Sequence, residues 1–320
     1  MNKNAYEIFD QKVKSRQSYL QNDMIRHWSN IDEAVYSINS DWEMLRDGGF
    51  TSDDILADRS ATDKFLMDIS HEVIYTLRKN SVTGAFIILD QPITESGSIV
   101  SRPGLYVRDP SPESSAKDNS DLAIKYGSAA LYRYLGITTD ISWTPRVSFN
   151  AETPELNAYF DLPMEAAHKY SKLATADLGY WSLPIISDES SHPVFTYTVP
   201  LRDSTGEAYG ILGIEISADY LKKLLPPYEL NADNRASYCI ARSTGDSDHF
   251  CVAASTGMFL KPYASDGTML TSSTTVDADG CYQIDDSSKA KVYVSTQYLQ
   301  LYNSGTPFAA DKWALLGIVN

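Results

Sequence analysis

The stretch from His192 to Ser217 constrains the fold of this chain more than any other. Residues 194–201 alternate in character and are rich in β-branched and aromatic side chains, and a second apolar run extends from Ala208 to Ile216. Residues 203–206, Asp-Ser-Thr-Gly, lie between the two runs and favour a turn. The pattern predicts a β-hairpin whose short turn fixes the pairing of its strands.

The two faces of this hairpin differ in chemistry, because successive side chains of a strand point to opposite sides. One face would be apolar and would need a cover: Phe195, Tyr197, Val199, Leu201, Leu212, Ile214 and Ile216. The other face would be partly polar: Thr196, Thr198, Ile211, Gly213 and Glu215. A glycine inside a strand often marks the close approach of a ligand or of another backbone. With a carboxylate beside it, Gly213 predicts a polar pocket on this face.

Three motifs lie in or near the hairpin: Gly-Tyr-Trp-Ser-Leu-Pro at residues 179–184, Thr-Tyr-Thr-Val-Pro-Leu at 196–201, and Tyr-Gly-Ile-Leu-Gly-Ile-Glu-Ile-Ser at 209–217, with Gly206 before the last. Together they resemble the double Cache (dCache) sensor domain of bacterial transmembrane receptors. The best-matching block covers roughly residues 155–230, and the general layout extends over the whole chain. The resemblance implies an α+β fold with a long N-terminal helix followed by two PAS-like (Cache) modules, each with an antiparallel sheet.

The same resemblance implies three parts of the chain. Residues 1–46 would form the long helix, residues 47–225 the membrane-distal, ligand-binding Cache module, and residues 226–320 the membrane-proximal module. A chain of 320 residues is long enough for two domains. Pro226 and Pro227 would stop a short helix at the boundary between the modules.

Residues 5–46 are predicted to form one long helix. In its second part, apolar residues recur in steps of three and four: Met24, Trp28, Ile31, Val35, Ile38, Trp42 and Leu45. Such a stripe suits a helix that packs on its own sheet, and also a coiled coil. The first part has a thinner stripe through Ile8, Val13 and Leu20, where a partner helix is an alternative. Because this helix often contributes to a parallel dimer in the dCache family, a homodimer through it is a reasonable expectation.

The distal module is predicted to contain further regular elements. A buried strand is expected at Gly84–Asp90 and a short one at Leu105–Arg108, with loop in most of residues 91–120. Helices are expected at Asp58–Lys79, at Asp121–Leu135, and from Pro154 toward Lys172 with a break or kink at Pro163.

The proximal module is predicted to be a smaller antiparallel sheet. Its strands would be Ala236–Arg242, Phe250–Ser255, Cys281–Asp285, Lys291–Tyr302 and Trp313–Val319. Cys239 and Cys251 could face each other across a hairpin as a disulfide, or remain buried free thiols.

Charge and hydropathy exclude several classes of partner. A formal net charge of −15 argues against binding to nucleic acid and to an anionic membrane surface. The sequence contains no apolar run of the roughly 20 residues needed to cross a bilayer, and its N-terminus lacks the apolar core of a signal peptide. The resemblance implies contact with the membrane only through flanking segments outside this chain, with the domain extracytoplasmic.

Motifs of catalysis and metal binding are missing from the sequence. It contains no Walker loop, dinucleotide fingerprint, zinc-protease motif or nucleophile elbow. The five histidines are scattered without metal-ligand spacing, and residues 277–280, Asp-Ala-Asp-Gly, read as a turn rather than a calcium loop. We therefore expect a non-catalytic domain with no metal and no cofactor.

The resemblance also points to a ligand-binding site. Amino-acid-binding dCache domains carry an Arg-x-Trp-Tyr motif, which aligns here with residues 157–160, Asn-Ala-Tyr-Phe, so the carboxylate-binding arginine is absent. Glu215 stands in the place of their final aspartate. With Tyr159, Trp181 and Asp188 it would form an aromatic box for an amine or an amino-acid-like ligand.

Other residues complete the predicted site. Trp143 and Arg146 would also line it, beside Thr196, Thr198 and Gly213 of the hairpin. The alternative is that the aromatic residues belong to the core and that Glu215 pairs with a nearby arginine.

The function that follows is extracytoplasmic sensing of a small molecule by a transmembrane receptor. Its output, a histidine kinase, a diguanylate cyclase or a chemotaxis module, would lie outside this chain. The alternative function is a secreted solute-binding protein that delivers a small ligand to a transporter.

Overall fold

The computed structural model describes residues 1–114, 118–186, 192–231, 235–244, 249–257, 266–267, 269–271, 274–276, 282–284 and 292–319. The chain divides into two compact units. The first unit combines Met1–Arg26 with Ala218–Asn320, and the second is His27–Ser217. Each unit is built on a seven-stranded sheet.

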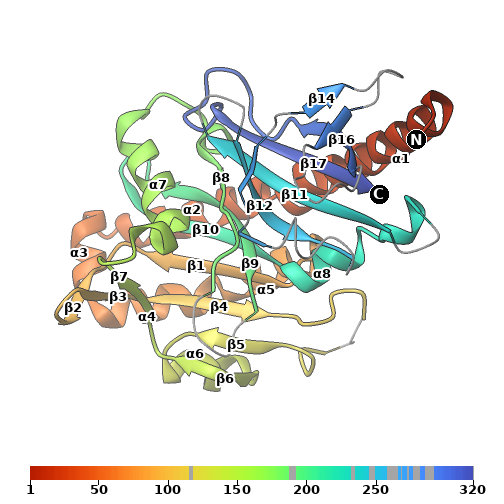
Figure 1. Cartoon of the computed structure of the whole chain (residues 1–320). Helices are drawn as coiled ribbons and strands as arrows, with labels where there is room; N and C mark the ends of the chain where they lie inside the picture. The colour runs from red at the N-terminus through yellow and green to blue at the C-terminus, as the bar shows by residue number, and fades with distance from the viewer. Residues whose placement is uncertain are drawn as a thin grey trace. The chain divides into compact units, whose positions relative to one another are not determined.

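The sheet of the second unit has the strand order β6-β5-β4-β1-β10-β9-β8. Its strands are β1 (Gly84–Leu89), β4 (Gly104–Arg108), β5 (Ala123–Tyr126), β6 (Thr138–Thr144), β8 (Tyr180–Trp181), β9 (Val194–Arg202) and β10 (Ala208–Ser217). All neighbours are antiparallel except β5 and β6, which are parallel. The predicted strands at residues 84–90 and 105–108 are confirmed as β1 and β4, and β1 lies between β4 and β10 (Figure 1).

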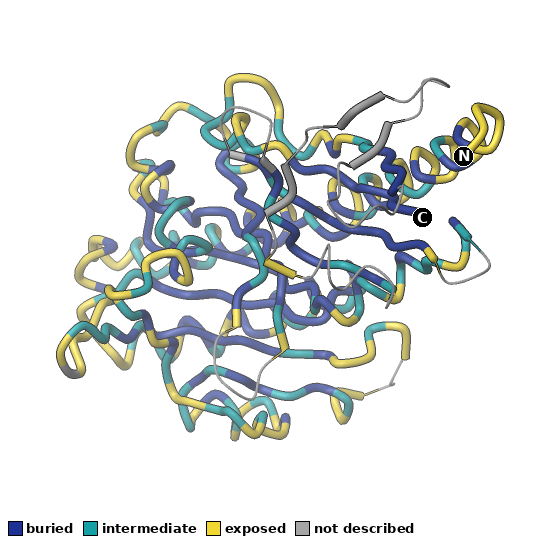
Figure 2. The backbone as a smooth tube through the Cα atoms, viewed as in Figure 1, coloured by how far each residue is buried: buried dark blue, intermediate teal, exposed yellow. Residues whose placement is uncertain are grey.

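The predicted hairpin is confirmed as β9 and β10. Val199 lies opposite Leu212, Thr198 opposite Gly213 and Thr196 opposite Glu215, so the two predicted faces are correct. In the turn, the Asp203 carboxylate accepts hydrogen bonds from the backbone N–H and the hydroxyl of Thr205, at 2.9 and 2.6 Å. Both strands are buried along almost their whole length (Figure 2), which explains their apolar composition.

The predicted long N-terminal helix is present, but it is interrupted. It consists of α1 (Lys3–Asn22), the π-helix η1 (Asp23–Trp28) and α2 (Asp32–Arg46). At the interruption, the side-chain amide of buried Asn80 donates to the carbonyls of Trp28 and Asn30, at 3.0 and 3.1 Å. These bonds satisfy carbonyls that have lost their helical partners. A stripe of period 3.5 continues across such a break, so the sequence pattern did not reveal it.

The remaining helices of the second unit differ in part from prediction. They are α3 (Ser52–Ala57), α4 (Arg59–Asp68), α5 (Ser70–Lys79), α6 (Ala129–Leu135), α7 (Pro154–Lys169) and the 3₁₀ turn η2 (Thr175–Leu178). The single helix predicted for residues 58–79 is two helices that meet at Ile69. The helix predicted for residues 121–135 is wrong in its first half: residues 123–126 pair with β4, and the helix starts only where Ser128 caps it.

A three-stranded sheet occupies part of the region predicted as loop. It is formed by β2 (Ile93–Ser96), β3 (Ile99–Arg102) and β7 (Val147–Asn150), in the order β2-β3-β7. The helix α7 packs against β7 and also against β9 and β10 of the large sheet. These strands are short, and local sequence patterns detect short strands poorly.

The sheet of the first unit has the order β13-β12-β11-β17-β16-β15-β14. Its strands are β11 (Ala236–Thr244), β12 (His249–Ser255), β13 (Met269–Thr271), β14 (Thr274–Val276), β15 (Tyr282–Ile284), β16 (Val292–Leu299) and β17 (Asp311–Val319). The helix α1 packs against β16 and β17, and the unit also contains α8 (Ala218–Lys223) and the 3₁₀ turn η3 (Pro227–Glu229). The predicted antiparallel pairing is confirmed for the pairs that the structure describes. The prediction of a smaller sheet is wrong, since both large sheets have seven strands.

The two cysteines of this sheet are free thiols. Cys239 lies opposite Ser255 and Cys251 opposite Arg242, so the register does not place them across from each other. Burial raises the pKa of the Cys239 thiol to about 12, which keeps it protonated and unreactive. Cys281 and the turn at residues 277–280 lie outside the described residues.

Candidate functional site

A cavity of about 710 Å³ lies in the second unit. Its lining comes from β3, β5, β6, β7, the first turns of α7 and the segment before β9: Ile99, Tyr126, Ser142, Thr144, Ser148, Phe149, Asn150, Thr153, Leu156, Asn157, Tyr159, Ile185 and Ile186. Pockets that bind small organic molecules usually measure about 300–1,000 Å³. The cavity therefore has the size of a small-molecule site.

Aromatic rings form one wall of this cavity. The rings of Phe149 and Tyr159 stack with centroids 6.0 Å apart, and Phe149 also packs on Phe160 at 5.1 Å. The guanidinium of Arg102 lies 4.7 Å from the ring centroid of Phe149 and 4.4 Å from that of Phe160. Burial raises the pKa of Tyr159, so its hydroxyl stays protonated and can donate a hydrogen bond.

The polar groups of the lining are hydroxyls and amides: Ser142, Thr144, Ser148, Asn150, Thr153 and Asn157. The amide of Asn157 donates to the backbone carbonyl of Asn150 at 2.9 Å. The side-chain oxygen of Asn150 accepts from Ser98 at 3.0 Å and from the backbone N–H of Glu152 at 2.9 Å. These bonds hold β7 and the start of α7 together, and they fix the two asparagines that line the cavity.

Glu215 does not line this cavity. Its residue is only 1% exposed, and its carboxylate accepts hydrogen bonds from the hydroxyls of Tyr106 and Thr83, the latter at 3.0 Å. Arg108 lies 3.2 Å away as its ion-pair partner, and is itself 3.8 Å from Asp140. The alternative that the sequence left open, pairing of Glu215 with an arginine, is the arrangement in the structure.

Burial and charge shift the pKa values of both partners of Glu215. Burial, with the Glu215 charge, raises the pKa of Tyr106 well above its ordinary value. Burial alone would lower the pKa of Arg108, but Glu215, Tyr106 and Asp140 together outweigh it and raise the pKa overall. Glu215 and Arg108 are therefore a buried charge pair with a neutral tyrosine as hydrogen-bond donor.

A layer of aromatic side chains separates the predicted polar face from the cavity. A Cβ atom on Gly213 would come within 2.6 Å of Cε2 of Phe86, whose ring fills this space. Phe86 contacts Tyr106 at 4.8 Å and Tyr159 at 6.0 Å, and Tyr106 contacts Tyr126 at 5.6 Å, all between centroids. The sequence predicted a ligand directly on Gly213 and Glu215. In the structure the glycine instead admits a ring from the neighbouring strand.

Thr198 has a structural role that follows from Pro163. Because Pro163 has no N–H, the carbonyl of Tyr159 lacks its usual partner within α7. The hydroxyl of Thr198 donates to this carbonyl at 2.7 Å, so α7 runs through the proline without the predicted break and is fixed to β9. Thr196 is also engaged, since its hydroxyl donates to that of Ser182 at 2.9 Å.

Trp181, Trp143 and Arg146 are not among the residues that line the cavity. Trp181 is buried against Tyr197, with centroids 5.2 Å apart. The indole N–H of Trp143 donates to the carbonyl of Gly127 at 3.1 Å. Arg146 is half-buried at the turn between β6 and β7, and burial, with the nearby charge of Arg59, lowers its pKa.

Of the predicted site residues that the structure describes, Tyr159 lines this cavity and the others do not. Asp188 lies outside the described residues. Sequence reasoning missed the rest of the lining, including Tyr126 and Phe149, because Tyr126 was assigned to a helix and no element was predicted for the segment that contains Phe149. One signal was available: Asn157 belongs to the segment that aligns with the family's ligand-binding motif.

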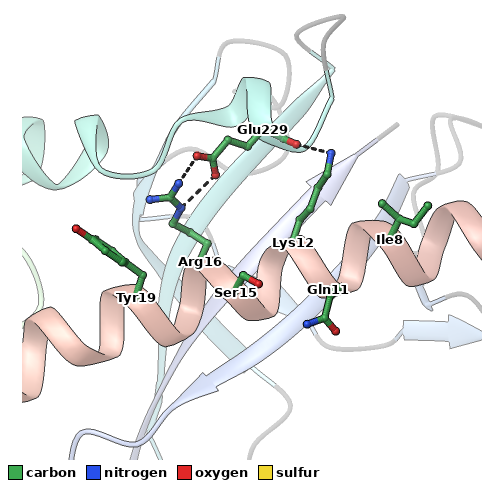
Figure 3. Close-up of a pocket in the computed structure, with 7 residues that line it drawn as sticks. All are labelled: Ile8, Gln11, Lys12, Ser15, Arg16, Tyr19 and Glu229. Atoms are coloured by element: carbon green, nitrogen blue, oxygen red, sulfur yellow. Dashed lines mark hydrogen bonds and ion pairs between the residues drawn. The ribbon is translucent and has the colours of Figure 1, made fainter.

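A second cavity, of about 760 Å³, lies along α1 in the first unit (Figure 3). Its lining is Ile8, Gln11, Lys12, Ser15, Arg16 and Tyr19 of α1, with Glu229 of η3. Arg16 forms an ion pair with the Glu229 carboxylate, and Lys12 donates to the Glu229 carbonyl at 2.7 Å. Ile8 is 61% exposed, whereas Val13 and Leu20 are buried within the unit. Of the residues predicted to face a partner helix, Ile8 is thus available, and the homodimer stays a prediction.

Within the described ranges, no group of three or more histidine, cysteine, aspartate or glutamate side chains is arranged to hold a metal ion. None of the helices in the described part of the chain is both long enough and apolar enough to span a bilayer.

Several solved structures resemble this chain. No protein-family model matches it, and no curated protein matches it. The periplasmic sensory domain of the Campylobacter jejuni chemoreceptor Tlp1 matches with a TM-score of 0.57 at 12% identity, over 99% of this chain and 95% of that domain. The ligand-binding domain of the Pseudomonas aeruginosa amino acid chemoreceptor PctC, solved with GABA, matches with a TM-score of 0.43 at 11% identity, over 98% and 97%. The match to the Tlp1 domain confirms the predicted sensor-domain fold.

Proposed function

We propose that this chain, with its sensory-domain fold, is the non-catalytic, extracytoplasmic ligand-binding domain of a transmembrane signalling receptor. The observation that supports this function best is the cavity of about 710 Å³ against Tyr126, Phe149 and Tyr159. Its size and its mixed aromatic and polar lining suit a small organic molecule. The membrane-spanning segments and the output module, a kinase, a cyclase or a chemotaxis module, would lie outside this chain.

The sequence also predicts an amine or an amino-acid-like ligand. Such a ligand needs an acidic side chain in reach, and Glu215 is occupied by Arg108, Tyr106 and Thr83. Asp188, the other predicted acid, lies outside the described residues. Of the two predicted acids, only Asp188 is therefore left to pair with a cationic ligand.

A route from the cavity to the end of the second unit supports signalling. A ligand against Tyr126 and Tyr159 would press on Tyr106 and Phe86, which contact those two rings. Phe86 and Tyr106 in turn cover Gly213 and Glu215 of β10, and β10 ends at Ser217, the last residue of the unit. We propose that binding shifts β10 between two positions through this aromatic layer.

A binding screen on the whole chain tests the proposed function. A ligand that binds the folded state raises the midpoint of thermal unfolding. We expect a library of small metabolites to contain at least one compound that stabilises the chain, with the stabilisation lost in Tyr159→Ala. Tyr75→Ala is the matched control, because Tyr75 lies in the same unit, is 50% exposed and does not line this cavity. Stabilisation that survives Tyr159→Ala would place the site elsewhere.

A further inference from the structure

We infer that the molecule held in this cavity is uncharged at neutral pH and combines an apolar or aromatic part with hydrogen-bonding groups. The inference rests on the proposed function and concerns the same cavity. None of the side chains that the structure describes in the lining carries a charge. Tyr126, Phe149 and Tyr159 offer ring faces, and Ser148, Asn157 and their neighbours offer neutral donors and acceptors.

Two charged groups near this lining, Asp140 and Arg102, are already engaged. Asp140 accepts two hydrogen bonds from Ser142, through its N–H and its hydroxyl, both at 2.9 Å, and lies 3.8 Å from Arg108. Arg102 donates to Asp90 at 3.1 Å while its guanidinium covers two aromatic rings. An ionic ligand that took its counter-charge from Asp140 or Arg102 would have to break one of these pairs.

An ion without a counter-charge is costly to bury, whereas a neutral polar group needs only a hydrogen bond. We therefore expect an ionised molecule to bind at least about tenfold more weakly than its neutral counterpart. The first turn of α7 faces the cavity through Thr153, Leu156 and Asn157. A helix N-terminus supplies only about half a positive charge, and the N–H of Leu156 already donates to the carbonyl of Thr153 at 3.0 Å. This end of the helix suits a carbonyl or hydroxyl oxygen better than a carboxylate.

Ligand-observed NMR on the whole chain tests the inference with three matched sets of fragments. The sets are substituted benzamides, benzylamines and benzoates, which share size and ring but are neutral, cationic and anionic at neutral pH. A fragment is assigned to the cavity when its signal change is lost in Tyr159→Ala and kept in Tyr75→Ala. We expect the benzamides to supply most of these cavity-specific signals and to bind at least about tenfold more tightly than the two ionic sets.

A charge placed in the lining sharpens this test. Ser148→Asp adds one carboxylate at an exposed position of the lining, so it should weaken the benzamides and create binding of the benzylamines. Ser148→Asn, which has nearly the same shape as Ser148→Asp but no charge, should not create binding of the benzylamines, and circular dichroism checks that both variants fold. Cavity-specific binding of benzylamines or benzoates to the unaltered chain, as tight as that of the benzamides, overturns the inference and leaves the proposed function standing. If no fragment of any set depends on Tyr159, both are overturned.

Discussion

The two large sheets carry the same three residues in their last strands but use them differently. Leu212-Gly213-Ile214 lies in β10 and Leu316-Gly317-Ile318 lies in β17. In each unit this strand pairs with the first strand of its sheet, and an aromatic residue stands opposite the glycine, Phe86 in β1 and Tyr238 in β11. The two strands are thus alike in sequence and in pairing, but different groups pack against their glycines.

Different parts of the chain fill the space above the two glycines. A Cβ atom on Gly213 would meet the ring of Phe86, a neighbour in the same sheet. A Cβ atom on Gly317 would meet Val13 and Phe9, two buried residues of α1. Both glycines mark a close approach, as a glycine inside a strand usually does. A glycine inside a strand therefore predicts that another group packs closely against it, but it does not predict which group that is.

The two strands also differ in the residue two positions after the glycine. It is Glu215 in β10 and Val319 in β17, opposite Gly84 and Ala236 respectively. Val319 is a buried apolar residue, whereas Glu215 forms a buried charge pair with Arg108. The second unit thus contains a buried ionic group directly beneath the aromatic layer of its cavity, at a position where the first unit is apolar.

The largest effect is expected from breaking this charge pair. Glu215→Ala leaves the half-buried Arg108 without its main partner, and should lower the free energy of unfolding by about 3 kcal/mol, the low end of the range for a buried pair, measured by urea denaturation. The double variant Glu215→Leu with Arg108→Met makes the position apolar, as in the first unit, and should recover most of the loss. A double variant as unstable as the single one would mean that the pair itself stabilises the fold.

The glycines should respond next, by about 1–3 kcal/mol each, because an added methyl group overpacks both sites. Gly317→Ala should be partly rescued by Val13→Ala, which empties the space on α1, and Gly213→Ala by Phe86→Leu. The crossed combinations, Gly317→Ala with Phe86→Leu and Gly213→Ala with Val13→Ala, are the controls and should be additive. Equal rescue in matched and crossed combinations would refute the assignment of the two fillers.

The pKa values of two aspartates, Asp203 in the second unit and Asp311 in the first, are shifted in opposite directions, so their contributions to stability should depend on pH differently. Burial would raise the pKa of Asp203, but hydrogen bonds from Thr205, Ser52 and Glu207 lower it overall. Its contribution is therefore present above the unfolded value of about 3.9 and is lost as the pH falls through the folded pKa. Burial raises the pKa of Asp311 in the first unit, against the opposing charge of Arg242.

We expect Asp203→Asn to cost about 2 kcal/mol at pH 7, since it removes hydrogen bonds to a charged group, and less below pH 4. Asp311→Asn should cost less than Asp203→Asn at pH 7, because its charged form is the disfavoured one. Urea denaturation from pH 3 to pH 7 measures both differences. A pH-independent loss for Asp203→Asn would contradict the assigned pKa shift.

The smallest effect concerns the helix that covers the cavity side of β9. Thr198→Val removes the hydroxyl that satisfies the Tyr159 carbonyl and should cost about 1–2 kcal/mol. In a Pro163→Ala background, residue 163 regains an N–H that can bond the same carbonyl, so the cost of Thr198→Val should fall close to zero. A cost unchanged by Pro163→Ala would mean that Thr198 acts through packing alone.

Much of the fold follows from local patterns. The hairpin, its register and its two faces were readable from residues 194–217, because side-chain alternation and turn chemistry act over a few residues. The break at residues 29–31 and the strand at residues 123–126 were not readable. Their stabilising partners, Asn80 and β4, are remote in sequence.

The candidate site was less predictable than the fold. Glu215 and Gly213 stood out in the sequence because they interrupt an apolar strand. In the structure Glu215 is a buried charged residue, and Gly213 is where the ring of Phe86 packs. Their residue types could not show that Arg108, Tyr106 and Phe86 would occupy them, since those residues come from other strands. Tyr159 was found because its segment aligns with a known motif.

The sequence by itself determined where the two strands and the turn of the hairpin form and which of its residues share a face, because backbone sterics and side-chain alternation are local. Only the tertiary structure decided what each face contacts. The ring of Phe86 packs on Gly213, the helix α1 packs on Gly317, and Arg108 pairs with Glu215. The cavity lined by uncharged side chains is likewise formed by residues from several elements. Packing brings together residues that are distant along the chain, and a local sequence pattern cannot predict such long-range contacts.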